Sequence, residues 1–140
     1  MSVGQHCQRD PVRAQRDDTV REVAKQMELQ SAGCVVVVDD KERPVGVLTD
    51  RDIVVRVLRR GLDPDDTRAD VAMSDEPSCV RETTPLTTAL RRMRSDAVRR
   101  LPVVGEEGKL VGLFHWNHAI AIVADELEQA ARVAAATNQA

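Results

Sequence analysis

The sequence predicts an α+β fold made of two similar halves that pack sheet to sheet about a pseudo-twofold axis. One observation is an ungapped internal repeat, in which an offset of 66 residues relates Gly46 to Gly112. The same offset relates Pro11 to Pro77, Met27 to Met93, Val37 to Val103, Val38 to Val104 and Val45 to Val111. A second observation is that both halves show an extended segment, an amphipathic helix, two short apolar strands and a helix. A half of this size buries too little apolar surface to be stable alone, so we expect the halves to pack together.

The first half is predicted to contain a helix, two strands and a second helix. Asp18 is expected to cap the first helix, which Gly33 ends. Its apolar face is formed by residues at helical spacing: Val20, Val23, Ala24 and Met27. The β-branched segment 34–38 and the segment 44–48 are predicted strands on either side of a polar turn. A helix is then expected from Thr49 to about Arg60, with Gly61 at its end.

The second half repeats this order after a polar segment that contains Pro64. Thr84 is expected to cap a helix that carries Leu86, Ala89, Leu90 and Met93. Strands are predicted at 101–104 and 110–114, and a last helix from about Trp116 to near Ala136. The predicted division is repeat 1 at 9–61, a linker at 62–70, repeat 2 at 71–124 and a C-terminal helical extension at 125–140. We expect the extension to pack on the N-terminal segment or a second subunit, or equally on its own domain.

Composition excludes several classes of function. The chain is 42% hydrophobic and 31% charged, and its one Phe, one Trp and no Tyr cannot form a stacking platform for single-stranded nucleic acid. Its formal net charge of −3 gives no reason to bind nucleic acid or an anionic membrane. An apolar run such as Cys34 to Val38 is too short to cross a bilayer. Three cysteines without a CxxC pair fit reduced thiols, so we expect a cytoplasmic protein.

The corner where segment 44–48 meets the following helix has two interpretations. The free N–H groups at a helix N-terminus favour an anion such as phosphate, and Asp52, one turn into the helix, could accept two sugar hydroxyls. Alternatively, Thr49 and Asp52 form a capping box, in which each side chain bonds to the other residue's backbone. The four residues alone favour the cap.

Three motifs resemble those of a CBS domain, and two such domains in tandem resemble a CBS pair, or Bateman module. They are Gly46-Val-Leu-Thr-Asp-Arg-Asp52, Pro77-Ser-Cys-Val80 and Arg100-Leu-Pro-Val-Val104, and the resemblance covers about 9–124. It implies an adenosine-containing ligand, such as AMP, ADP, ATP or S-adenosylmethionine, in the clefts between repeats, and no catalytic cofactor.

The resemblance also implies roles for single residues. Thr49 would contact phosphate or sugar, and Asp52 would hold the ribose hydroxyls by charge-assisted hydrogen bonds. Asp50 belongs to the same corner, and the candidate cations for phosphate are Arg51, Arg99 and Arg100. Adenine would lie among Val12, Ala14, Val35, Val80 and Leu101, positions that are core by default.

The second repeat departs from this pattern, because His115 replaces Thr49 and His118 replaces Asp52. We expect its cleft to be empty, filled by Trp116 or adapted to another ligand. The helix of the second repeat begins without Thr-x-x-Asp, which indicates that this fold does not need the cap. The preferred interpretation of Thr49 and Asp52 therefore changes from capping to ligand binding. His115 and His118 could bind a metal with His6 or Cys7, but no zinc-motif spacing is present, so no metal is expected.

The sequence therefore predicts a regulatory module that senses an adenine nucleotide and signals through homodimer geometry or an unidentified partner protein. The alternative is a CBS dimerisation scaffold without a ligand. A metal or redox sensor that uses His115, His118 and the cysteines is a third possibility. No nucleophile–base motif or phosphate loop is present, so an enzyme is not expected.

Overall fold

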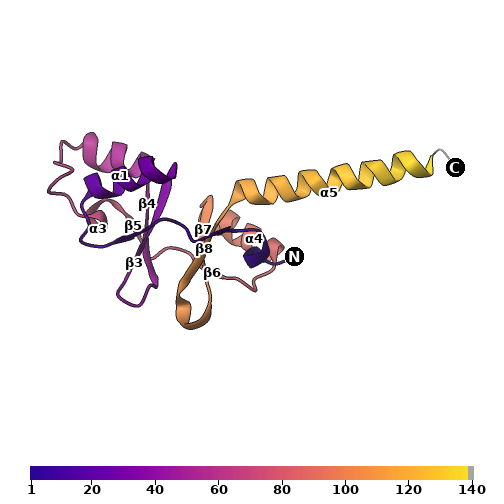
Figure 1. The fold of residues 1–140 in the computed structure, drawn as a ribbon, viewed down its shortest axis with the longest axis horizontal. Helices are drawn as coiled ribbons and strands as arrows, with labels where there is room; N and C mark the ends of the chain where they lie inside the picture. Colours follow the sequence, from indigo (N-terminus) through magenta and orange to yellow (C-terminus); the bar gives the residue numbers. More distant parts are fainter. Residues whose placement is uncertain (139–140) are drawn as a thin grey trace.

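Two four-stranded β-sheets pack face to face, and each carries helices on its outer side (Figure 1). The computed structural model describes residues 1–138. The first sheet has the order β2 (Arg13–Gln15), β3 (Cys34–Val38), β4 (Pro44–Thr49) and β5 (Ser74–Asp75). The second has the order β1 (Gln8–Arg9), β8 (Leu110–His115), β7 (Arg100–Val104) and β6 (Val80–Arg81). The α+β class and the sheet-to-sheet packing are confirmed.

The helices follow the same repeat. The first half contains α1 (Val20–Gln30) and α2 (Asp50–Ile53), which continues as a π-helical turn, η2 (Val54–Leu58). The second half contains α4 (Leu86–Asp96) and the long α5 (Trp116–Thr137), with a short η3 (Glu106–Gly108) in its hairpin. Two further short helices are η1 (Val3–Gln5) and α3 (Ala69–Ala72). The offset of 66 residues maps α1 onto α4, β3 onto β7 and β4 onto β8 with identical bounds.

Each sheet takes one edge strand from a neighbouring part of the chain. Gln8 of β1 pairs antiparallel with Leu113 of β8, and Asp75 of β5 pairs with Gly46 of β4. At both places glycine leaves room for another segment that crosses close to it. A Cβ on Gly112 would lie 2.9 Å from the Gln8 carbonyl oxygen, and one on Gly46 would overlap the Met73 side chain. The Gly46–Gly112 pair of the repeat therefore marks where an edge strand crosses.

Three apolar clusters hold these layers together. One lies between the first sheet and its helices, and a second lies between the second sheet and its helices. The third lies between the sheets and contains Cys34, Val36 and Val38 with Leu110 and Leu113. Alternate β3 residues thus face opposite layers, which explains why all five are buried.

Two predicted helix caps are wrong by one residue. The N-cap of α1 is Thr19, and the N-cap of α4 is Pro85. Asp18 instead accepts a hydrogen bond from the Gln15 N–H at 2.8 Å, and Thr84 Oγ1 accepts one from the Arg81 N–H at 3.1 Å. Both residues therefore close the turn that precedes the helix, a use of short polar side chains that competes with capping.

The segment predicted as a linker packs along the first half. Thr67 is buried, and its carbonyl oxygen accepts a 2.8 Å hydrogen bond from the N–H of Val20. The Pro64 carbonyl oxygen accepts one from Arg21 at 3.1 Å. The predicted division into 9–61, 62–70, 71–124 and 125–140 stays a prediction, and positions 139–140 lie outside the described residues.

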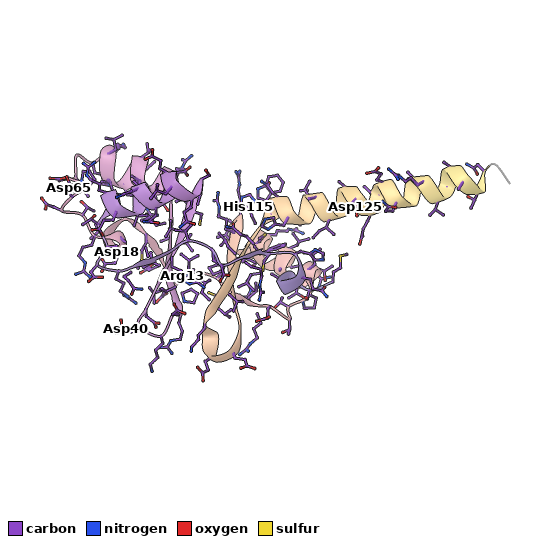
Figure 2. The ribbon with its side chains drawn as sticks, in the orientation of Figure 1. Arg13, Asp18, Asp40, Asp65, His115 and Asp125 are labelled. Atoms are coloured by element: carbon purple, nitrogen blue, oxygen red, sulfur yellow. The ribbon has the colours of Figure 1, made fainter. Side chains whose placement is uncertain are left out.

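Helix α5 extends beyond the sheets, with Asp125 on its projecting part (Figure 2). Ala119 and Ile122 pack in the second core, in the same cluster as Val3 and Cys7 of the N-terminal segment. From Val123 to the end of the described residues, every side chain is exposed. Within residues 1–138, no helix is long and apolar enough to cross a membrane.

Candidate functional site

A cavity of about 510 Å³ lies between the two halves, beside the corner that joins β4 to α2. It is lined by Thr49 and Asp52 from that corner, by the segment around β5, and by Arg99 and Arg100 at the start of β7. The structure therefore brings together four residues that the sequence singled out from separate repeats. We call this cavity the first cleft.

Other lining residues were missed by sequence reasoning. They are Val47, Ser74, Asp75, Glu76, Pro77, Ser78, Asp96, Ala97 and Val98. Segments 74–78 and 96–98 each precede a strand of the second repeat, and although Pro77 and Ser78 belong to a CBS-like motif, sequence reasoning assigned no residue of these segments a role in binding. The internal repeat could have predicted these segments. The offset of 66 residues relates 74–78 to 8–12, before β2, and 96–98 to 30–32, before β3.

The residues proposed to surround adenine do not line the first cleft. Ala14 and Val35 belong to the core of the first half, and Val80 and Leu101 to the core of the second, all nearly inaccessible to solvent. Val12 packs against the first core. Strand alternation is the reason, because Arg100 faces the cleft and its neighbour Leu101 must then face the helices. Asp50 and Arg51 are exposed and also lie outside the cleft lining.

Thr49 and Asp52 form a complete capping box at the start of α2. Thr49 Oγ1 accepts a hydrogen bond from the Asp52 N–H at 3.1 Å, and the Thr49 N–H donates to Asp52 Oδ2 at 2.9 Å. Asp52 Oδ1 lies 3.9 Å from Nε of Arg56, whose guanidinium donates to the carbonyl oxygens of Ala72 and Met73. Capping uses one carboxylate oxygen, so Oδ1 still offers lone pairs to a ligand.

A second, smaller cavity of about 250 Å³ lies across the pseudo-twofold, beside the corner that joins β8 to α5. Its lining includes Arg100, His115, Asn117 and His118, together with Gln8 of the neighbouring strand β1 and segment 30–34 of the first half. Figure 2 shows His115 at the base of α5, where the second half borders the first. Trp116 is 41% exposed and is not part of this lining, so it does not fill the cavity. We call this cavity the second cleft.

His115 and His118 rebuild the helix cap that the sequence seemed to have lost. His115 Nδ1 accepts from the Asn117 N–H, and His118 Nδ1 accepts from the His115 N–H, both at 3.1 Å. The inference that this architecture can do without the cap is therefore wrong, because imidazole nitrogens supply the acceptors. Both corners are capped, so capping and ligand binding are not alternatives at Thr49 and Asp52.

The environment of the second cleft favours the neutral form of both imidazoles. Burial lowers the pKa of His115, with Arg100 as the next cause, and burial also lowers the pKa of His118. A neutral ring with an accepting Nδ1 carries its proton on Nε2, so each Nε2–H is a donor. Protonation would have to occur at Nδ1 and would remove the cap.

We expect stability to fall when the pH is lowered from 7.5 to 5. The folded pKa values of His115 and His118 lie below the usual 6.5, so the unfolded chain binds more protons in this range. The stabilisation is complete above pH 6.5 and is lost as the pH falls toward the folded pKa values. Urea unfolding at several pH values measures this dependence.

The matched control is the double variant His115→Thr/His118→Asp, which copies the first corner and has no imidazole there. Its stability should change less between pH 7.5 and pH 5 than that of the wild type. An identical pH dependence in both proteins would contradict the histidine cap.

The metal and redox interpretations gain no support from the geometry. Within residues 1–138, no group of three or more His, Cys, Asp or Glu side chains is placed to hold a metal ion. Burial raises the pKa of Cys34 to about 11, so its thiol stays protonated near neutral pH and is a poor nucleophile. The expected absence of a metal stays a prediction.

Comparisons with known proteins identify the family. The family model described as CBS domain matches residues 3–59 and 68–125, so the chain belongs to the CBS domain family and carries two repeats in tandem. An uncharacterized protein of Methanopyrus kandleri is 35% identical over 113 residues, which cover 81% of this chain and 58% of that protein. The chain thus spans less than two thirds of the first curated relatives it matches.

Solved structures show the same fold. A CBS domain protein from Pyrobaculum aerophilum, complexed with AMP, is 32% identical, with a TM-score of 0.75 over 84% of this chain and 89% of that one. Hypoxic Response Protein I, solved with two coordinated zinc ions, is 26% identical, with a TM-score of 0.78 over 86% of this chain and 98% of that one. CBS pairs are in general regulatory, non-catalytic modules, some of them in complex with AMP or ATP. That this chain is not an enzyme stays a prediction.

Proposed function

We propose that this protein is a regulatory module that binds an adenosine-containing nucleotide in the first cleft. The observation that carries the proposal is the convergence of Thr49, Asp52, Arg99 and Arg100 on one cavity of about 510 Å³. A cavity of this volume lies within the range of small-molecule sites, about 300–1,000 Å³. The AMP complex of the Pyrobaculum relative supports the class of ligand.

The hydroxyl and carboxylate lie where they suit a ribose phosphate. Asp52 Oδ1 is the carboxylate oxygen that capping leaves open, and it can accept hydrogen bonds from sugar hydroxyls. Arg99 and Arg100 make no ion pair within residues 1–138, so their guanidinium groups are available to a phosphate. Thr49 Oγ1 retains its hydroxyl donor, because it acts only as an acceptor in the cap.

The charge of the first cleft selects among nucleotides. Its lining contains four carboxylates, from Asp52, Asp75, Glu76 and Asp96, but only two guanidinium groups. Asp96 accepts a 2.5 Å hydrogen bond from Ser78 Oγ at the cleft wall. This excess of acid repels a triphosphate more than a monophosphate. We therefore favour AMP, or the cationic S-adenosylmethionine, over ADP and ATP.

Signalling follows from the position of the cleft between the repeats. A ligand that contacts Asp52 of the first half and Arg99 of the second links the two sheets. It shifts their relative arrangement only if it binds one arrangement more tightly than another. Exposed apolar side chains on η2 and α5, among them Leu58, Ile120 and Leu127, support the homodimer expected from the sequence. The homodimer, an unidentified regulated protein and a cytoplasmic location stay predictions.

The test is ligand binding by protein purified free of nucleotide. AMP, ADP, ATP and S-adenosylmethionine are compared at equal concentration and ionic strength by thermal shift and by calorimetry. A ligand at about 100 times its Kd should stabilise the fold by about 2.7 kcal/mol, with AMP or S-adenosylmethionine ahead of ATP. If none of the four binds at millimolar concentration, the nucleotide proposal fails and the dimerisation scaffold takes its place.

A further inference from the structure

The two clefts have opposite electrostatic character, although the repeats that form them are similar. The first cleft contains four carboxylates, whereas the lining of the second contains none. The second cleft is lined by the Arg100 guanidinium, the two imidazoles and the amide side chains of Gln8, Gln30 and Asn117. Its polar wall therefore contains one permanent cation and several hydrogen-bond donors, with no competing negative group.

The donors of this wall are defined by the helix cap. Because both Nδ1 atoms accept backbone N–H groups, His115 and His118 can offer only Nε2–H to a ligand. The backbone donors at the start of α5 are already used, since the Trp116 N–H donates to the Arg99 carbonyl oxygen at 3.0 Å. An anion in this cleft would therefore be held by side chains and not by the helix terminus.

Arg100 is the cation of the site. Within residues 1–138 its guanidinium makes neither an ion pair nor a hydrogen bond, and its charge lowers the pKa of His115. Two acids act on Cys34 of the lining, Asp52 and Asp50, and Asp50 Oδ2 lies 3.2 Å from the place of a Cβ on Gly33. Asp50 is exposed and lies outside the lining, so solvent screens its charge.

We propose that the second cleft binds a small phosphate-type anion, held by Arg100 and by the Nε2–H groups of His115 and His118. Its volume of about 250 Å³ is below the usual range for sites that enclose a drug-sized ligand, about 300–1,000 Å³, which favours phosphate or pyrophosphate over a nucleotide. The absence of a ribose-accepting carboxylate at His118 agrees with that choice. Arg100 lines both clefts, so a ligand in the first cleft would compete for its guanidinium, but the proposal does not require the first cleft to bind a nucleotide.

The test is calorimetry with pyrophosphate and inorganic phosphate at pH 7.5, against chloride at matched ionic strength. Arg100→Gln should weaken pyrophosphate binding about tenfold or more, because a charge-assisted hydrogen bond is lost. His115→Thr and His118→Gln should each weaken it several-fold while keeping a cap acceptor at the same position. Far-UV circular dichroism and melting temperature verify that each variant is folded.

Two matched controls locate the anion. His6→Gln removes a histidine that lines neither cleft, and Arg99→Gln removes a cation that lines only the first cleft. His6→Gln should bind pyrophosphate as the wild type does, and Arg99→Gln should weaken binding less than His115→Thr or His118→Gln does, because Arg99 lies outside the lining although its charge reaches His115. The proposal is overturned if the wild type binds no pyrophosphate, if His115→Thr and His118→Gln bind it unchanged, or if Arg99→Gln weakens it more than the histidine variants do.

Discussion

The Asp52→Ala variant is expected to bind AMP about 100-fold more weakly than the wild type. Its carboxylate would accept hydrogen bonds from the ribose hydroxyls, and a hydrogen bond to a charged group contributes about 1.5–3 kcal/mol. Asp52 is largely shielded from water, with a side chain only 19% exposed, so solvent does not replace the lost acceptor fully. Isothermal titration calorimetry measures the change directly.

Asp52 also caps α2, so this variant needs a control for lost stability. Glu22→Ala breaks the equivalent box at α1, where Thr19 and Glu22 exchange two hydrogen bonds of 3.2 Å. Both variants should lose about 0.5–2 kcal/mol of stability, the usual value of a cap. Only Asp52→Ala should lose AMP affinity, because Glu22 lies outside the first cleft. Equal AMP affinity in all three proteins would leave Asp52 with the capping role alone.

The repeat made most of the architecture predictable. The offset of 66 residues, recognised from a few identical residues, predicted the positions of α1, α4, β3, β4, β7 and β8. It did so because the apolar residues that face each core recur at the same spacing in both halves. The edge strands β1 and β5 were not predicted. Each has only two residues, too few for an alternating pattern, and the partner of each is far away in the sequence.

The first cleft was predictable only in part. Thr49 and Asp52 could be identified from the sequence, because a hydroxyl and a carboxylate at a strand-to-helix corner indicate a binding role by their residue types alone. The remaining wall depends on which face of a strand each residue occupies, and one step along β7 separates Arg100 in the cleft from Leu101 in the core. The residues proposed to surround adenine therefore lie in the two cores and outside the lining of the first cleft, and their role in ligand binding stays a prediction.

The histidine cap shows a different limit of sequence reasoning. His115 and His118 occupy the positions of Thr49 and Asp52, yet histidine is not among the usual capping residues. The replacement therefore looked like a loss of the cap. Neutral imidazole provides one acceptor nitrogen, which is enough for each bond, and it leaves a donor where the first repeat has a carboxylate. The replacement of Thr and Asp by His115 and His118 therefore keeps the helix cap, but it puts a hydrogen-bond donor in the cleft where the first repeat has a negatively charged acceptor.

The Phe114→Ala variant is expected to lose about 3–5 kcal/mol of stability, the usual cost of removing a buried aromatic ring. Phe114 on β8 is fully buried in the second core. Its ring centroid lies 5.8 Å from that of His118, so the same side chain supports the second corner. A loss of this size is a large fraction of the 5–15 kcal/mol typical of a domain. Urea unfolding followed by circular dichroism measures it.

Leu29→Ala is the control, because Leu29 is 67% exposed and its removal should cost less than about 0.5 kcal/mol.

The number of unfolding transitions shows whether the two halves unfold together. The N-terminal strand β1 completes the sheet of the second half, and β5 completes that of the first, so neither half keeps its four strands if the other unfolds. We therefore expect Phe114→Ala to lower one cooperative transition. Two separate transitions, with only one of them shifted, would show that the halves fold independently.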